Sequence, residues 1–176
     1  NYSSLSNVVS ALDMEKIRRT RGYHLRPSDN APPRRIAFIQ CVGSRNTSHG
    51  NLWCSRVCCP YALKMARAMQ AEQPESKITF FYMDLQNCDR DPDKTLNTCR
   101  SSFRFLRIMP VDILPGENDS VIIRYMSEEE TIKEDPFDLV VLSVGMEPGA
   151  DSASLARMLD IDLNGHGFFR AASEGD

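Results

Sequence analysis

The sequence predicts an α/β fold in which a parallel sheet carries an antiparallel β-meander. Three observations support this class. Two short apolar runs at 36–39 and 78–83 flank a stretch of good helix formers, a third apolar run lies at 139–145, and weaker strand patterns lie between the last two runs. The 176 residues are enough for one domain with its own hydrophobic core.

The first half of the chain predicts a βαβ unit preceded by a helix and a linker. Residues 7–19 have an amphipathic helical pattern, and the prolines of 21–35 favour an extended linker. We expect a buried parallel strand at 36–39, a helix at 61–69 that ends near Pro74, and a second buried strand at 78–83. Such a strand, helix and strand form a right-handed βαβ unit.

The second half predicts the meander and a returning strand. Residues 86–102 are polar, with one short helix expected around Leu96. The later elements are expected as strands at 105–114, 121–125, 130–133 and 139–145, a turn at 115–118 and a helix at 153–159. This order indicates a Rossmann-like, three-layer fold of the NAD-binding-domain type. The predicted organisation is an N-terminal helix and Pro-rich linker at 1–34, the Rossmann-like domain at 35–170, and a tail at 171–176.

Composition and charge argue against two classes of protein. No apolar run reaches the roughly 18 residues of a membrane span, and a net charge of −3 is unusual for a nucleic-acid-binding protein. The charge is uneven, because residues 1–35 hold seven Lys and Arg against three Asp and Glu, whereas 108–176 hold four against fifteen. The chain opens on Asn1 without an apolar leader, so we expect a cytoplasmic segment of a longer polypeptide.

The unusual feature is a group of four cysteines directly after the first buried strand. A dinucleotide-binding fold places the motif G-x-G-x-x-G at this position, but here residues 41–45 read CVGSR. NAD binding of the usual kind is therefore not expected. The loop instead holds a C-x12-C-x3-C-C array, formed by Cys41, Cys54, Cys58 and Cys59.

The position of these thiols favours a four-cysteine [4Fe–4S] site. Pro60 suits the first position of the following helix, so Cys58 and Cys59 are expected at its N-terminus, where N–H groups and the helix dipole stabilise thiolates and anionic clusters. Three alternatives remain open. They are cysteines without a metal, a structural zinc ion, which adjacent cysteines fit poorly, and a redox dithiol, for which C-x-x-C is the usual spacing.

Neighbouring residues fit a cluster pocket as well. The residues expected to shield the site or to offset its charge are Trp53, Val57, Arg45 and Arg56. His49 is an alternative ligand, although a solvated loop histidine is the simpler interpretation. Cys88 and Cys99 lack partners at ligand spacing, so they are expected as free thiols or as an adventitious disulfide.

Six segments together carry a family resemblance. They are NVVSALDMEK at 7–16, RPSD at 26–29, IAFIQCVGSRNTSHGNLWCSRVCCPYAL at 36–63, FYMD at 81–84, DLVVLSVGMEP at 138–148 and GHGFF at 165–169. On these residues the chain resembles the A subunit of heterodisulfide reductase and its relatives, including the quinone-interacting oxidoreductase subunits of sulfate reducers. The resemblance covers almost the whole chain and departs at 87–99, which read NCDRDPDKTLNTC.

The resemblance implies an iron–sulfur flavoprotein related to thioredoxin reductase, with an FAD-binding domain interrupted by a module like a pyridine-nucleotide domain. This chain resembles the inserted module alone, so FAD belongs to the parent protein. The implied ligands of a [4Fe–4S] cluster are Cys41, Cys54, Cys58 and Cys59. The implied role is electron transfer between FAD and partner iron–sulfur subunits, in some members with flavin-based bifurcation.

Two other functions stay open. One is an NAD(P)H-binding domain of a pyridine-nucleotide-disulfide oxidoreductase, with structural or redox-active cysteines. The other is a cofactor-free docking module that uses the uneven charge. On the leading interpretation the segment is part of an oxidoreductase and is not active alone. Its expected partners are the flanking FAD-binding domain and other iron–sulfur redox subunits, with no nucleic acid.

Overall fold

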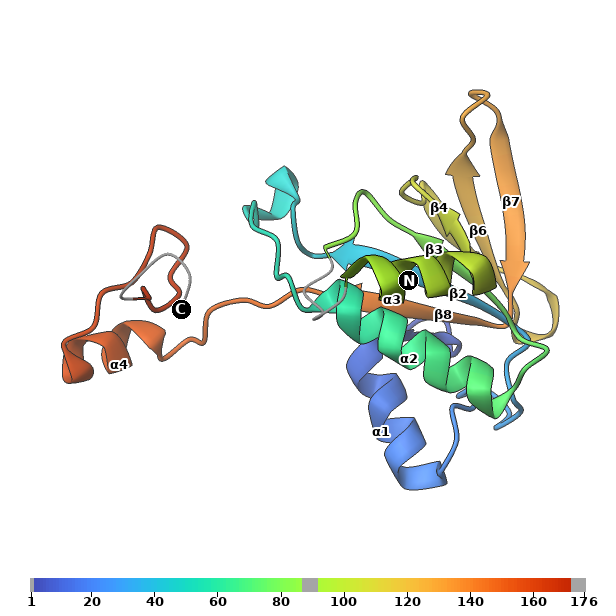
Figure 1. Ribbon diagram of the computed structural model, residues 1–176, viewed down its shortest axis with the longest axis horizontal. Helices are drawn as coiled ribbons and strands as arrows, with labels where there is room; N and C mark the ends of the chain where they lie inside the picture. The colour runs from blue at the N-terminus through green and yellow to red at the C-terminus, as the bar shows by residue number, and fades with distance from the viewer. Residues whose placement is uncertain (1, 87–91, 172–176) are drawn as a thin grey trace. The chain divides into compact units, whose positions relative to one another are not determined.

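Five parallel strands form the central sheet of the computed structural model, which describes residues 2–86 and 92–171. All neighbouring strands in this sheet pair in parallel. Their sequences are almost continuously apolar, as strands buried on both faces require. In spatial order the strands are β1 (Val8–Ser10), β8 (Leu139–Val144), β2 (Arg35–Val42), β3 (Lys77–Phe81) and β4 (Arg104–Leu106) (Figure 1).

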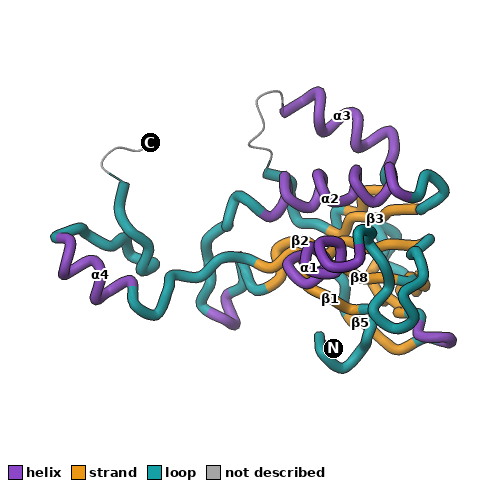
Figure 2. Tube along the Cα trace, turned by 90° about the horizontal axis from the view of Figure 1, so that it is seen from below, coloured by secondary structure: helices purple, strands orange, loops and turns teal. Residues whose placement is uncertain are grey.

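Three helices cover one face of this sheet. They are α1 (Ala11–Arg21), α2 (Cys58–Glu72) and α3 (Pro92–Ser102). Their apolar side chains pack on strand residues such as Phe38 and Phe80, whose rings stack with their centroids 4.9 Å apart. Figure 2 shows α2 and α3 on the same side of β2 and β3. Strand β2, helix α2 and strand β3 form the βαβ unit predicted from the sequence.

A second, antiparallel sheet covers the opposite face. Its strands, in spatial order, are β5 (Asp112–Pro115), β6 (Val121–Met126) and β7 (Ile132–Phe137). Every second residue of β6 points to the core, where Val121, Ile123 and Tyr125 pack with Ile39 and Phe81 of the parallel sheet. Helices, parallel sheet and antiparallel sheet make three layers, which confirms the predicted α/β fold with an antiparallel meander.

Several predicted elements have different bounds in the structure. The helix predicted at 61–69 spans Cys58–Glu72, and the strand predicted at 130–133 spans Ile132–Phe137. The strand predicted at 105–114 is divided, because β4 joins the parallel sheet while β5 starts the antiparallel one, and Pro110, which has no N–H to donate, lies between them. The helix predicted at 7–19 begins at Ala11, because the preceding residues are extended and pair with β8. Ser10 then caps the helix, its Oγ accepting a hydrogen bond from Asp13 N–H at 3.1 Å.

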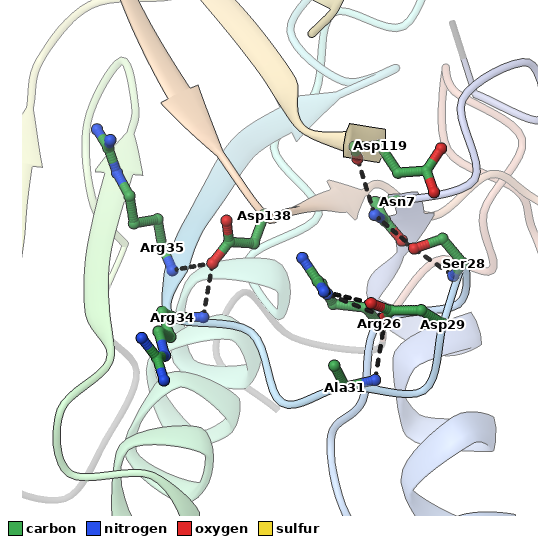
Figure 3. Close-up of polar contacts among 9 residues, drawn as sticks. All are labelled: Asn7, Arg26, Ser28, Asp29, Ala31, Arg34, Arg35, Asp119 and Asp138. Atoms are coloured by element: carbon green, nitrogen blue, oxygen red, sulfur yellow. Dashed lines mark hydrogen bonds and ion pairs between the residues drawn. The ribbon is translucent and has the colours of Figure 1, made fainter. Parts of the chain in front are cut away.

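Polar side chains fasten the amino end of the parallel sheet (Figure 3). The carboxylate of Asp138, just before β8, accepts hydrogen bonds from the backbone N–H groups of Arg34 and Arg35 at 2.8 and 2.9 Å. Asn7, just before β1, donates to Ser28 Oγ at 3.0 Å and to the Asp119 carbonyl at 2.9 Å. The segment predicted as a linker is therefore attached to the sheet by specific hydrogen bonds.

The chain divides into two units, Asn1–Gly145, which contains both sheets, and Met146–Asp176. The second unit contains helix α4 (Ser152–Leu159), predicted at 153–159, and a short bridge between Leu163 and Phe169. The Asn164 side chain closes the turn inside this bridge by accepting hydrogen bonds from the N–H groups of His166 and Phe168. None of the helices in the described part of the chain has the length and apolar character needed to cross a membrane.

Candidate functional site

Cys41 lies at the carboxyl end of the central strand β2, where the backbone leaves regular pairing. Ile39 pairs with Leu142 of β8 and Val42 pairs with Val144, so β2 holds one more residue than β8 over this stretch. Cys41 takes up the difference with a left-handed backbone, at φ 58°. Its side chain is buried, at 6% exposure. The bulge therefore turns a thiol inward at the end of the strand.

The loop after Cys41 is held by its own hydrogen bonds. The backbones of Asn46 and Asn51 form a bridge, and the Asn51 amide donates to the Gly43 carbonyl at 3.0 Å. This folds the loop back so that Cys54 returns toward β2, half-buried, with its sulfur accepting a hydrogen bond from the backbone N–H of Arg56 at 3.4 Å. The loop therefore has a definite conformation although it contains little regular structure.

A close contact fixes the same loop to the end of β8. Ser44 Oγ and Ser55 Oγ form a buried hydrogen bond of 3.1 Å. Gly145 lies directly beside this pair, because a Cβ atom built there would stand 1.8 Å from Ser44 Oγ and 2.9 Å from Ser55 Oγ. Only a residue without a side chain allows the backbone of the β8 terminus to approach this closely.

Cys58 and Cys59 are the first two residues of helix α2 and are both buried, at 5% and 2% exposure. Pro60 was expected at the first helical position and lies at the third instead, where its missing N–H is equally acceptable because the first N–H groups of a helix have no partner within it. The capping residue Val57 provides no side-chain hydrogen bond to the helix. The N-terminus of α2 therefore presents its two thiols without a side-chain cap.

The pKa values of the buried thiols are shifted in different directions. A hydrogen bond from Cys59 lowers the pKa of Cys58 to about 6, and the same hydrogen bond, together with burial, raises the pKa of Cys59 well above its usual range. Burial raises the pKa of Cys41, and negative charge on Cys58 and Cys54 raises it further, while Arg45 opposes the shift. These mutual effects show that the four thiols share one electrostatic environment.

Arg45 is a cation that acts on these thiols. Its guanidinium forms an ion pair with Asp84, just beyond the end of β3, and it opposes the rise in the pKa of Cys41. The left-handed backbone of Arg45, at φ 54°, directs the loop into this position. The expectation that Arg45 offsets negative charge near the cysteines therefore agrees with the position of its side chain.

Two buried polar side chains at the same end of the sheet have no hydrogen-bond partner. They are Gln40, whose Oε1 and Nε2 atoms are both unpaired, and Ser143, whose Oγ is unpaired, counted over the residues that the structure describes. The sequence does not single them out, because one polar residue that interrupts an apolar strand is weak evidence of a site when taken alone. That interruption, Gln40 after IAFI and Ser143 after LVVL, is the signal that could have identified them.

The other residues singled out from the sequence differ in their exposure to solvent. Trp53 is half-buried, Val57 is 48% exposed, and Arg56 is exposed with a left-handed backbone. Cys99 is a free thiol of α3, 1% exposed, that points into the core. Cys88 and the side chain of His49 lie outside the described residues.

The chemistry of the four thiols fits a four-cysteine cluster. In a [4Fe–4S] cluster each thiolate binds a different iron, so the sulfurs surround a larger group. Four cysteines from β2, the loop and the N-terminus of α2 provide this donor set. Across 2–86 and 92–171, no three or more His, Cys, Asp or Glu side chains are grouped as ligands of one metal ion.

Comparison with known proteins identifies relatives along nearly the whole chain, although no family model matches it. The chain is 37% identical over 180 residues to the A subunit of the H(2)/formate:CoB-CoM heterodisulfide,ferredoxin reductase of Methanococcus maripaludis, covering 96% of this chain and 27% of that protein. It is 36% identical over 180 residues to the iron-sulfur A subunit of the CoB--CoM heterodisulfide reductase of Methanocaldococcus jannaschii, with the same two shares.

The fold is also similar to that of the L-lysine 6-monooxygenase from Pseudomonas syringae. The TM-score is 0.51 at 10% sequence identity, and the match covers 92% of this chain and 46% of that one. This likeness supports the Rossmann-like class predicted from the sequence. The chain belongs to the family of heterodisulfide reductase A subunits, and it spans about a quarter of the length of the curated relatives that it matches.

Proposed function

We propose that this chain is the electron-transfer domain of a flavoprotein oxidoreductase like the A subunit of heterodisulfide reductase. In this proposal Cys41, Cys54, Cys58 and Cys59 hold a [4Fe–4S] cluster. Electrons pass between FAD, bound elsewhere in a longer polypeptide, and partner iron–sulfur subunits. The name of the Methanocaldococcus jannaschii relative, an iron-sulfur subunit, supports the cofactor.

The observation that carries the proposal is the replacement of a phosphate-binding loop by thiols. In an open α/β sheet, ligands bind beyond the carboxyl ends of the parallel strands, where the connections diverge to the two sides. Here that place lies between β2 and β8, because α2 and β3 continue to one side of β2 and β8 lies on the other. Cys41 and the N-terminus of α2 both reach this place.

The residues of the chain are suited to holding such a group. The hydrogen bond from Cys59 lowers the pKa of Cys58, which favours the thiolate, the form that binds iron. The N-terminus of α2 and the guanidinium of Arg45 stabilise negative charge at the thiols. Burial of Cys41, Cys58 and Cys59 limits the access of water. A bound [4Fe–4S] cluster supplies one-electron transfer at a potential that its surroundings set.

Reconstitution tests the proposal directly. The chain is incubated anaerobically with ferrous iron and sulfide, desalted, and analysed for iron, sulfide and the paramagnetic resonance spectrum after reduction. We expect about four irons per chain, and loss of the spectrum when Cys58→Ala or Cys59→Ala removes a ligand. Cys99→Ala is the matched control, since it also removes a buried free thiol but leaves the array intact.

Other outcomes would support the alternatives. Colourless protein with one zinc per chain after the same anaerobic treatment would contradict the proposal. Binding of NADH or NADPH to the cluster-free chain, measured by calorimetry, would favour a nucleotide-binding domain. Salt-sensitive binding to a partner subunit that persists after replacement of all four cysteines would favour a docking module.

A further inference from the structure

Gln40 is a fully buried amide without a hydrogen bond. Its exposure is 0%, and neither Oε1 nor Nε2 has a partner among the described residues. Burying an amide without a hydrogen bond destabilises a fold, whereas an apolar side chain of the same shape carries no cost of this kind. A glutamine at this position therefore weakens the cluster-free fold, and the packing of the chain itself gives no reason for it.

The strand places Gln40 on the side of the cysteine pair. Along β2 the side chains of Ile36 and Phe38 point to the helical layer, while Ala37 and Ile39 point to the meander. Gln40 follows in the helical series, two residues after Phe38 and one before Cys41. The helix that packs on both β2 and β8 is α2, and its end at the carboxyl edge of these parallel strands is its N-terminus.

Ser143 repeats this arrangement on the neighbouring strand. It is 2% exposed, and its Oγ has no partner among the described residues. It follows Val141, which points to the helical layer, by two residues. In the register of the two strands it falls between Leu142 and Val144, opposite the extra residue of the β2 bulge. Gln40 of β2 and Ser143 of β8 thus lie side by side in the strand register, on the helical face of the sheet. Neither side chain has a hydrogen-bond partner among the described residues.

We infer that Gln40 and Ser143 donate hydrogen bonds to the cysteine-bound cluster and raise its reduction potential. This inference rests on the proposed function and assigns two residues beyond the four ligands. The amide Nε2 and the hydroxyl Oγ are both donors, and the sulfurs of a [4Fe–4S] cluster are acceptors. Reduction adds one electron and breaks no bond, so the negative charge rises and donors stabilise the reduced form more than the oxidised form.

The test compares midpoint potentials of the reconstituted chain. Gln40→Met keeps the unbranched shape and removes the donor, and Ser143→Ala removes the hydroxyl. Each sample is titrated anaerobically with dithionite in the presence of redox mediators, and the reduced cluster is followed by its paramagnetic resonance signal. We expect a more negative midpoint potential in each variant, a larger shift in the double variant, and an altered spectrum, with the iron content unchanged.

Ser76→Ala is the matched control. Ser76 is also buried, at 6% exposure, and its Oγ also has no partner among the described residues, but it precedes β3 at the amino end of the sheet. We expect its removal to leave the potential where it is. A shift in Ser76→Ala equal to that in the other variants would overturn the inference, because it would reflect a general change in the fold.

Failure of the proposed function and failure of this inference give different results. If the unchanged chain takes up no iron, the proposed function is wrong and the inference falls with it. If the cluster assembles and Gln40→Met and Ser143→Ala leave its potential unchanged, only the inference is wrong. Loss of iron from Ser143→Ala would also overturn it, since hydrogen bonds that adjust the potential leave all four ligands in place.

Discussion

The two ends of the parallel sheet differ in the partners of their polar side chains. At the amino end, Asp138 accepts two backbone N–H groups, and the side chain of Asn7 connects Ser28 with the carbonyl of Asp119 (Figure 3). These bonds join segments that lie far apart in the sequence, although the nearby Ser76 hydroxyl is unpaired among the described residues. At the carboxyl end, Ser44 and Ser55 pair with each other, whereas the side chains of Gln40 and Ser143 have no hydrogen-bond partner among the described residues.

The pairing of the strands also differs between the two ends. At the amino end, β2 pairs regularly with β3 and β8 from its first residues. At the carboxyl end, β2 has a bulge at Cys41, whose backbone is left-handed. Left-handed residues also occur in the loops at the amino end, such as Asp119, but not within its paired strand residues. We therefore expect substitutions of the hydrogen-bonded side chains at the amino end to cost more stability than changes at the carboxyl end.

The largest loss of stability is expected at the amino end of the sheet, where side-chain hydrogen bonds join distant segments. Asn7→Ala removes both donated hydrogen bonds and leaves Ser28 and the Asp119 carbonyl without this partner, so the free energy of unfolding should fall by about 3 kcal/mol. Urea denaturation of the cluster-free chain measures the loss. The iron content after reconstitution should stay the same, because Asn7 lies at the other end of β1 from the thiols.

Asn7→Asp is the control for this change. It keeps the oxygen that accepts the N–H of Ser28 at 3.2 Å but puts a buried carboxylate oxygen against the Asp119 carbonyl, so its loss of stability should be at least as large as that of Asn7→Ala. A loss below about 1 kcal/mol in Asn7→Ala would show that the amino end is not fastened in this way.

At the carboxyl end we expect a smaller loss of stability and a larger loss of bound iron. Gly145→Ala places a Cβ against the Ser44–Ser55 pair and must displace the cysteine loop, which should cost about 2 kcal/mol and reduce the iron retained after reconstitution. Adding Ser44→Ala removes the atom at 1.8 Å and should restore part of the iron content.

Gly165→Ala is a matched control, because a Cβ atom there meets nothing within 4 Å. It should change neither stability nor iron content. If Gly145→Ala retained its iron in full, the proposed site would not depend on the loop that Gly145 holds in place.

Most of the fold follows from patterns visible in the sequence. The runs at 36–39, 78–83 and 139–145 become β2, β3 and β8 because buried parallel strands need continuous apolar sequence. The strand β1 escapes prediction, since its Val8 and Val9 fit a helical period as well as a strand. Only pairing with β8, about 130 residues later, decides between them, and such long-range pairing leaves no local pattern.

The cysteine array can be read from the sequence, but its surroundings cannot. The spacing of Cys41, Cys54, Cys58 and Cys59 is visible in the sequence, and the structure places them at the carboxyl end of β2, in the following loop and at the start of α2. That a cluster binds there stays a prediction. The roles of Gln40 and Ser143 depend on which partners a buried group lacks, and this becomes visible only when the neighbouring strands and helices are in place.

The smallest expected effect compares two helix N-termini at this carboxyl end. Helix α1 is capped by Ser10 and Asp13, whereas α2 has no side-chain cap at Val57. Hydrogen bonds from Ser10 and from Tyr2 lower the pKa of Asp13 from 3.8 to about 2. Because this pKa is depressed in the folded state, the carboxylate stabilises the fold above about pH 4, and the benefit is lost as the pH falls toward 2.

Asp13→Asn should therefore lower the free energy of unfolding by about 1 kcal/mol near neutral pH, and the difference from the unchanged chain should shrink as the pH falls from 4 toward 2. Ser10→Ala is the companion variant. Without the Ser10 hydroxyl, the pKa of Asp13 should rise back toward 3.8, which a carboxyl titration by NMR measures. A difference that stayed constant across this pH range would mean that the charge on Asp13 contributes nothing to the stability of the capped N-terminus of α1.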